Sequence, residues 1–191
     1  AIARQGELRR NGHDVSLSIN LSNKAFEDPE LFNKIEMAIR LSKANAEKLI
    51  FEINETTEIS DIAATKKIMT RIQGLGCQFS LDDFGVGFSS LGHLTSLPFE
   101  YVKIDGSFVT DLANNSDNKA LVNALSEVAI SFNMLTVAEF VDSIQTLKIL
   151  RLAKINYAQG YLIGKPSETI PVELPDFFRA NEFKRSNRYS M

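Results

Sequence analysis

The sequence is poor in the side chains that build thiolate and imidazole metal sites. It contains one cysteine, Cys77, and two histidines, His13 and His93, which lie far apart in the chain. A single cysteine cannot close an internal disulfide, so the sequence agrees with a reducing compartment, and we expect a cytoplasmic protein. The same scarcity excludes a zinc site built from cysteines and argues against one built from histidines.

The sequence also lacks a long apolar run and a basic excess, and these two absences limit the classes of partner that the protein can have. No apolar run approaches the roughly 18 residues that a membrane-crossing helix needs, and no segment resembles a signal peptide. The formal net charge is -3, so the chain has no basic excess to hold a nucleic-acid backbone. We therefore expect a soluble protein without a polymeric nucleic-acid partner. A small phosphate ligand held through a metal is still compatible with this charge.

The chain does have enough apolar residues for one globular core. Of its 191 residues, 44% are hydrophobic and 24% are charged. We expect one domain over residues 1–168, because strand and helix signals alternate throughout it. In residues 169–191 this alternation is lost, and Pro171, Pro175 and a basic stretch predict a surface tail.

Short apolar runs predict the strands of the domain. They cover residues 15–20, 49–53, 78–81, 101–104, 135–138 and a short element near 155–158. Helix signals separate them: Ser60 or Asp61 predicts one helix cap, and Asp117 predicts the cap of the longest helix. The predicted apolar side of that helix consists of Leu121, Leu125, Val128, Ala129 and Phe132. Strands that alternate with helices indicate an α/β fold with a parallel sheet.

Polar residues stand at or just past the carboxyl end of every predicted strand. They are Asn20, Glu52, Asp82 with Asp83, Lys103, Glu139 and Gln159. An open doubly wound sheet gathers its chemistry at one switch point, whereas a closed barrel brings every strand end to one mouth. The pattern therefore favours a TIM-like (β/α) barrel, here incomplete, with about six of the eight strands that such a barrel needs.

The most distinctive stretch is residues 79–91, in which an apolar run is followed by Asp82 and Asp83, two glycines and a pair of serines. Two neighbouring aspartates at a strand end repel each other unless a cation lies beside them, which indicates a divalent metal. The alternative is one aspartate that caps a helix next to one that is solvated. The stretch alone favours neither interpretation.

Several segments, in chain order, resemble the successive motifs of EAL domains, the phosphodiesterases of bacterial cyclic di-GMP. These segments are SINLS, FEINETTE, SLDDFGVGFSSL, YVKIDGSFV, TVAEFVDS and AQGYLIGKP, and they run from about Val15 to Pro166. The resemblance implies a TIM-like barrel that binds two Mg2+ or Mn2+ ions and hydrolyses cyclic di-GMP to linear pGpG. It also implies a parent protein with N-terminal sensory or GGDEF domains, to which any inner-membrane anchor would belong.

The resemblance further implies a role for nine residues. Four match metal ligands: Asn20, Glu52, Asp82 and Asp83. Three match catalytic positions: Glu55, which positions the loop after Asp83, and Lys103 and Glu139, which lie near the attacking water. Two match substrate-binding positions: Asp105 and Gln159. An oxygen-donor set of this kind suits Mg2+ or Mn2+ rather than zinc. Lys103 is left with two possible roles, as a base or as a charged group that steadies the phosphate.

The chain also departs from the family pattern. It lacks the Glu-Ala-Leu strand that names the family and supplies a further metal ligand. Asn54 stands where a threonine is usual, and Phe140 and Asp142 stand where glycine and glutamate are usual. Two hypotheses follow. In the first, the parent protein is an enzyme, and this chain is its C-terminal portion, which is itself inactive or nearly so. In the second, the chain is a degenerate EAL domain that senses cyclic di-GMP or a protein without cleaving the dinucleotide. Because an open barrel exposes strand edges, we also expect a homodimer.

Overall fold

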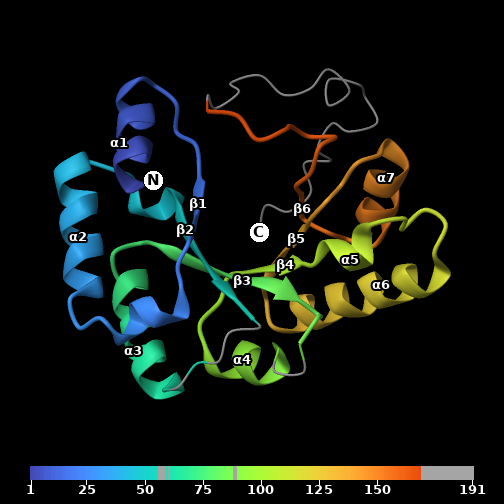
Figure 1. The fold of residues 1–191 in the computed structure, drawn as a ribbon, viewed down its shortest axis with the longest axis horizontal. Helices are drawn as coiled ribbons and strands as arrows, with labels where there is room; N and C mark the ends of the chain where they lie inside the picture. The colour runs from blue at the N-terminus through green and yellow to red at the C-terminus, as the bar shows by residue number, and fades with distance from the viewer. Residues whose placement is uncertain (56–58, 60, 88–89, 169–191) are drawn as a thin grey trace.

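The computed structural model describes residues 1–55, 59, 61–87 and 90–168, which form one parallel sheet surrounded by helices (Figure 1). The six strands follow one another across the sheet in chain order: β1 (Leu17–Asn20), β2 (Leu49–Asn54), β3 (Gln78–Phe84), β4 (Tyr101–Ile104), β5 (Leu135–Ala138) and β6 (Tyr157–Ala158). This order, with every neighbouring pair parallel, confirms the predicted fold class of an incomplete barrel. The predicted tail, 169–191, lies outside the described residues.

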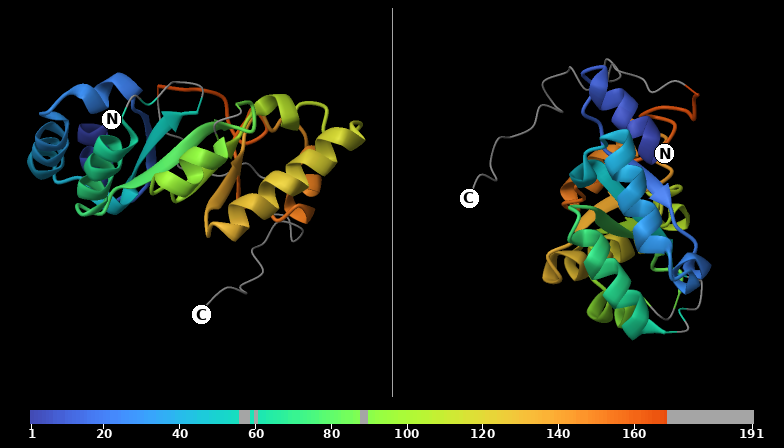
Figure 2. Two further views of the ribbon diagram at one scale, coloured as in Figure 1. Left: turned by 90° about the horizontal axis from the view of Figure 1, so that it is seen from below. Right: turned by 90° about the vertical axis from the view of Figure 1, so that its left-hand side faces the viewer.

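Helices lie along the outer side of the curved sheet. They are α1 (Ile2–Arg10), α2 (Leu31–Ser42), α3 (Ile62–Gln73), α4 (Ser90–Ser96), α5 (Gly106–Val109), α6 (Ser116–Ser131) and α7 (Ile144–Leu152), with short 3-10 turns η1 (Asn23–Glu27) and η2 (Ala46–Lys48). In the left view of Figure 2, α2 and α6 lie at opposite ends of the molecule, with the strands between them. No helix in the described part of the chain is long and apolar enough to cross a membrane.

The core lies between the strands and these outer helices. Phe51 on β2 and Phe79 on β3 are 2% and 0% exposed, and their ring centroids are 5.7 Å apart. Because side chains alternate along a strand, the intervening residues Glu52 and Ser80 point to the opposite, concave face. The polar side chains therefore lie on the inner face of the sheet, while the apolar side chains on the outer face pack against the helices.

The helix predictions were partly correct. Asp61 caps α3, as predicted, by accepting a hydrogen bond from the backbone N–H of Ala64. The cap predicted for the longest helix was wrong: Asn115, not Asp117, caps α6, because its side-chain oxygen accepts hydrogen bonds from two backbone N–H groups of the first turn. The predicted apolar side was correct for Leu125, Val128 and Ala129, which pack in or against the core, and wrong for Leu121, which is 38% exposed.

Strand β3 continues beyond the predicted end at Leu81 and includes both aspartates. Its register with β4 shifts between Leu81 and Phe84, which is the mark of a bulge or similar irregularity. Within this irregularity Asp83 has a φ of 59°, in the left-handed region that most residues avoid. The two carboxylates are therefore held by an irregular strand rather than by the loop that follows it.

Replacing Phe51 with alanine tests this view of the core. We expect the free energy of unfolding to fall by about 3–5 kcal/mol, because the fully buried ring leaves a cavity between β2, β3 and the outer helices. Urea denaturation followed by circular dichroism measures the loss. Phe132→Ala is the matched control, since Phe132 is 37% exposed at the end of α6. Equal losses in the two variants would contradict the placement of the core.

Candidate active site

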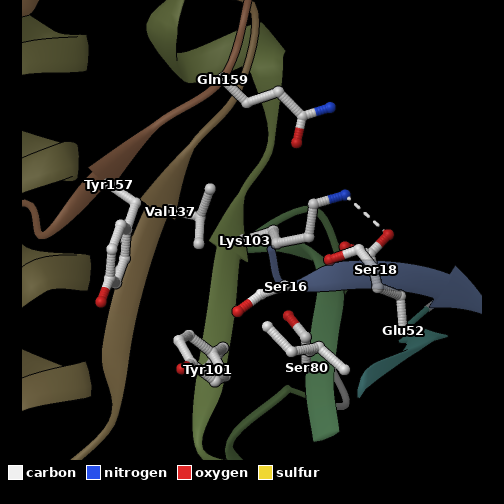
Figure 3. Close-up of a pocket in the computed structure, with 10 residues that line it drawn as sticks. Ser16, Ser18, Glu52, Ser80, Tyr101, Lys103, Val137, Tyr157 and Gln159 are labelled. Carbon is white, nitrogen blue, oxygen red and sulfur yellow. Dashed lines mark hydrogen bonds and ion pairs between the residues drawn. The ribbon is translucent and has the colours of Figure 1, made fainter. Parts of the chain in front are cut away.

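A buried lysine lies at the centre of the carboxyl ends of the strands. Lys103 on β4 is 5% exposed. Its Nζ lies 2.8 Å from Oδ1 of Asp82 on β3, 2.8 Å from Oε1 of Glu139 after β5, and 3.3 Å from Oε2 of Glu52 on β2. Figure 3 shows the contact between Lys103 and Glu52. The strand ends predicted to meet at one mouth do so for these four residues.

The charges in this cluster affect one another's protonation. Burial by itself lowers the pKa of Lys103, but hydrogen bonds to Asp82 and Glu139 and the charge of Glu52 outweigh it, and the pKa of the lysine is raised. The pKa of Glu139 is raised because burial disfavours its charged form more than the Lys103 ammonium favours it. The carboxylates therefore hold Lys103 as an ammonium ion in the structure described.

Three carboxylates of this site could hold a metal ion. Ligand oxygens of Asp82, Asp83 and Glu139 all lie within 4.8 Å of one another. The two aspartates are half-buried and Glu139 is buried, so these groups have lost part of their hydration and gain from a cation. Carboxylate oxygens are the donors that hard divalent cations prefer. The donor chemistry thus fits the metal class expected from the sequence.

Asp83 is held by a partner that the sequence did not predict. The side-chain amide of Asn54, at the end of β2, donates a hydrogen bond to Oδ2 of Asp83. The two residues come together because Asn54 lies opposite Asp82 in the β2–β3 register. Asn54 stood out in the sequence only as a departure from the family pattern, and its contact depends on strand register, which the sequence alone does not fix.

Glu55 contacts the loop after β3. It is 2% exposed, its Oε2 accepts a hydrogen bond from the backbone N–H of Gly85 at 3.2 Å, and its own N–H donates to the backbone oxygen of Asp82 at 3.0 Å. A Cβ on Gly87 would lie 2.4 Å from Oε1 of Glu55, so a side chain there would displace the Glu55 carboxylate. These contacts agree with the positioning role that the family resemblance implies for Glu55.

Three other predicted residues lie at or just past the ends of their strands. Asn20 is exposed and lies opposite Glu52 in the β1–β2 register, so it borders the site from the edge strand. Gln159 follows β6 and is also exposed; Figure 3 shows its side chain on the same side of the sheet as Lys103. The carboxylate of Asp105 is engaged as the cap of α5, where it accepts a hydrogen bond from the N–H of Ser107 at 2.9 Å.

A cavity of about 200 Å³ opens on the concave face beside Lys103 (Figure 3). Its lining includes Glu52, Ser80, Tyr101 and Tyr157. Ser80 is 2% exposed, and its Oγ has no hydrogen-bond partner among the described residues. Sequence reasoning missed Ser80, Tyr101 and Tyr157, although each stands two residues before a predicted site residue and therefore on the same face of its strand.

The strand ends of this parallel half-barrel gather acidic side chains around one lysine. This arrangement defines the class of the protein: a (β/α) barrel with an oxygen-donor site at its mouth. The family model described as "EAL domain" matches residues 1–166. The chain therefore belongs to the EAL domain family.

Similar proteins come from several bacteria. The cyclic di-GMP phosphodiesterase PdeB of Shewanella oneidensis is 39% identical over 153 residues, which are 80% of this chain and 18% of PdeB. The cyclic di-GMP phosphodiesterase PdeF of Escherichia coli is 32% identical over 80% of this chain and 20% of its own length. The chain thus spans about a fifth of the length of these curated relatives.

Solved structures of EAL domains have the same fold. The EAL domain of Mycobacterium smegmatis DcpA is 31% identical, with a TM-score of 0.83 over 87% of this chain and 75% of that one. The PaMucR phosphodiesterase in complex with c-di-GMP is 32% identical, with a TM-score of 0.79 over 87% of this chain and 68% of that one.

Replacing Lys103 with methionine tests the ion cluster. We expect the free energy of unfolding at neutral pH, in EDTA, to fall by about 3–5 kcal/mol, because three buried or half-buried carboxylates lose their shared cation. Lys34→Met is the matched control: Lys34 pairs with Asp28 at 2.6 Å, but in the open, and its removal should not measurably change stability. Urea denaturation of both variants measures the difference, and similar losses would contradict a buried cluster.

Proposed function

We propose that the protein to which this chain belongs hydrolyses cyclic di-GMP to linear pGpG in a metal-dependent reaction, and that this chain supplies most of the residues at the reacting centre. The observation that carries the proposal is the contact of Lys103 with Glu52, Asp82 and Glu139 at the ends of neighbouring strands. The names of PdeB and PdeF, both cyclic di-GMP phosphodiesterases, support it.

We assign the metal site to Mg2+ or Mn2+, held by Asn20, Glu52, Asp82 and Asp83. The proximity of ligand oxygens of Asp82, Asp83 and Glu139 supports this assignment, and so does the absence of histidine or cysteine from that group. Bound there, such ions supply positive charge to the phosphodiester and acidify a water molecule.

The remaining residues orient the reactants. Glu139 accepts a hydrogen bond from the attacking water, and the Lys103 ammonium, 2.8 Å from Glu139 and from Asp82, fixes both carboxylates and adds a positive charge beside the phosphate. In the reaction, the water oxygen bonds to phosphorus and one phosphorus–ribose oxygen bond breaks. Glu55 keeps the loop after Asp83 in place, and Asp105 and Gln159 contact the substrate from the rim.

The second candidate function is a non-catalytic sensor of cyclic di-GMP or of a protein. The observation that favours it is Phe140, which is 67% exposed directly after Glu139, where the family pattern has glycine, so that its ring changes the mouth beside this carboxylate. A sensor of this kind binds the dinucleotide and releases it unchanged.

Substitution of two ligands distinguishes the enzyme from the sensor. In Mg2+ or Mn2+, we expect the parent protein to form pGpG, and Asp82→Ala and Glu52→Ala to slow its formation by more than about 100-fold, because each removes a metal contact. Asp14→Ala is the control and should leave the rate unchanged, because Asp14 is an exposed carboxylate before the amino end of β1. Liquid chromatography of the nucleotides gives the rates. Tight binding without any pGpG would instead support the sensor.

We further propose that the chain self-associates through its open sheet edges. In the described residues β1 pairs only with β2, and β6 only with β5, so each presents one row of unpaired backbone groups. Light scattering should give a mass of about twice 21.3 kDa that falls on dilution. A monomer at every concentration would count against a homodimer.

For the parent protein we propose a cytoplasmic EAL domain linked to N-terminal sensory or GGDEF domains. The name of MucR from Pseudomonas aeruginosa, a bifunctional diguanylate cyclase and cyclic di-GMP phosphodiesterase that is 34% identical over 81% of this chain, supports this arrangement. The chain covers only 18% of PdeB and 23% of MucR, which agrees with further domains in the parent protein.

A further inference from the structure

Phe140 is an exposed aromatic residue directly after Glu139 at the mouth of the half-barrel. Its side chain is 67% exposed, although a phenylalanine ring gains most from burial. Its φ is 54°, in the left-handed region that suits glycine and disfavours residues with bulky side chains. The position thus combines an unfavourable backbone conformation with an apolar surface left in water, a combination typical of residues that serve a ligand.

The ring of Phe140 packs against a neighbouring segment of the chain. It lies directly on Gly106, the first residue of α5, since a Cβ placed on Gly106 would come within 2.2 Å of Cδ2 of Phe140. Any side chain at position 106 would therefore displace the ring. Gly106 is buried while Phe140 is exposed, so the ring rests on the backbone of α5 and leaves most of its surface open to solvent.

The residues next to Phe140 are the polar groups of the rim. Glu139 precedes it and contacts Lys103 at 2.8 Å, and the N–H of Val141 after it donates to the backbone oxygen of Gln159 at 2.9 Å. Asp105 precedes the glycine on which the ring lies. The exposed ring thus lies between two segments that carry acidic residues, Glu139 on one and Asp105 on the other. Proteins bind nucleobases by stacking them on aromatic rings and by hydrogen bonds to their edges.

We propose that Phe140 is a stacking surface for a guanine base of the dinucleotide and so a determinant of affinity and base preference. This inference rests on the proposed function, because it takes cyclic di-GMP as the ligand. The ring lies one residue from Glu139, so a base stacked on it keeps its attached ribose phosphate near the carboxylates. The competing explanation is that the ring only covers Gly106 and holds the loop in place.

Binding of fluorescently labelled cyclic di-GMP, followed by anisotropy, tests the inference in the native chain and in Phe140→Leu, Phe140→Trp and Phe132→Leu. Stacking on an aromatic ring accounts for roughly a 5- to 150-fold change in affinity. We expect Phe140→Leu to bind about ten-fold more weakly and Phe140→Trp to bind as the native chain does. Phe132→Leu, at the exposed end of α6, should not change binding.

Competition separates stacking from a structural role. GMP carries a base and should displace the labelled ligand from the native chain about ten-fold better than from Phe140→Leu, whereas ribose 5-phosphate, which has no base, should compete equally in both. Equal binding by Phe140→Leu and the native chain, or an equal loss for the two competitors, would overturn the inference. If the native chain does not bind cyclic di-GMP, the measurement is repeated with the parent protein, and failure of the parent to bind rejects the proposed function and this inference with it.

Discussion

The structure depends on one buried ammonium group shared by three carboxylates. Glu52, Asp82 and Glu139 come from different parts of the sequence, and without a cation their mutual repulsion and lost hydration would push the strand ends apart. Lys103 meets all three from a central strand. The same contact therefore keeps the strand ends together and lies at the centre of the site that we propose for the phosphodiester and its metal ions.

The alternation of side chains between the two faces of the sheet makes this contact possible. Phe51 and Phe79 turn outward to the helices, so Glu52 and Ser80 turn inward. Ser80 lies opposite Glu52 on one side and Tyr101 on the other, and its small side chain leaves room for Lys103 to reach across β3 to Glu52. The outer face of the strands thus contributes to stability by packing against the helices, and the inner face carries the polar side chains of the site.

The sequence was sufficient for the strands, their order and the polar residues at their ends, because these follow from hydrophobic periodicity and from the geometry of parallel sheets. It was not sufficient where two local signals compete, as at Asn115 and Asp117, which are both good caps. Nor could it supply the hydrogen bond from Asn54 to Asp83, which depends on the β2–β3 register and on the irregularity of β3. The orphaned hydroxyl of Ser80 is likewise a property of packing, not of sequence.

The position of β1 at the end of the sheet has a consequence for Asn20. Lys103 and Asp82 lie on strands with a neighbour on each side, whereas Asn20 lies on a strand that pairs only with β2 among the described residues. Edge strands of this kind fray, and their amides exchange with solvent more readily than those of central strands. For the ligand set that we propose this means unequal rigidity: transient opening at β1 would displace Asn20 while the group around Lys103 stays intact.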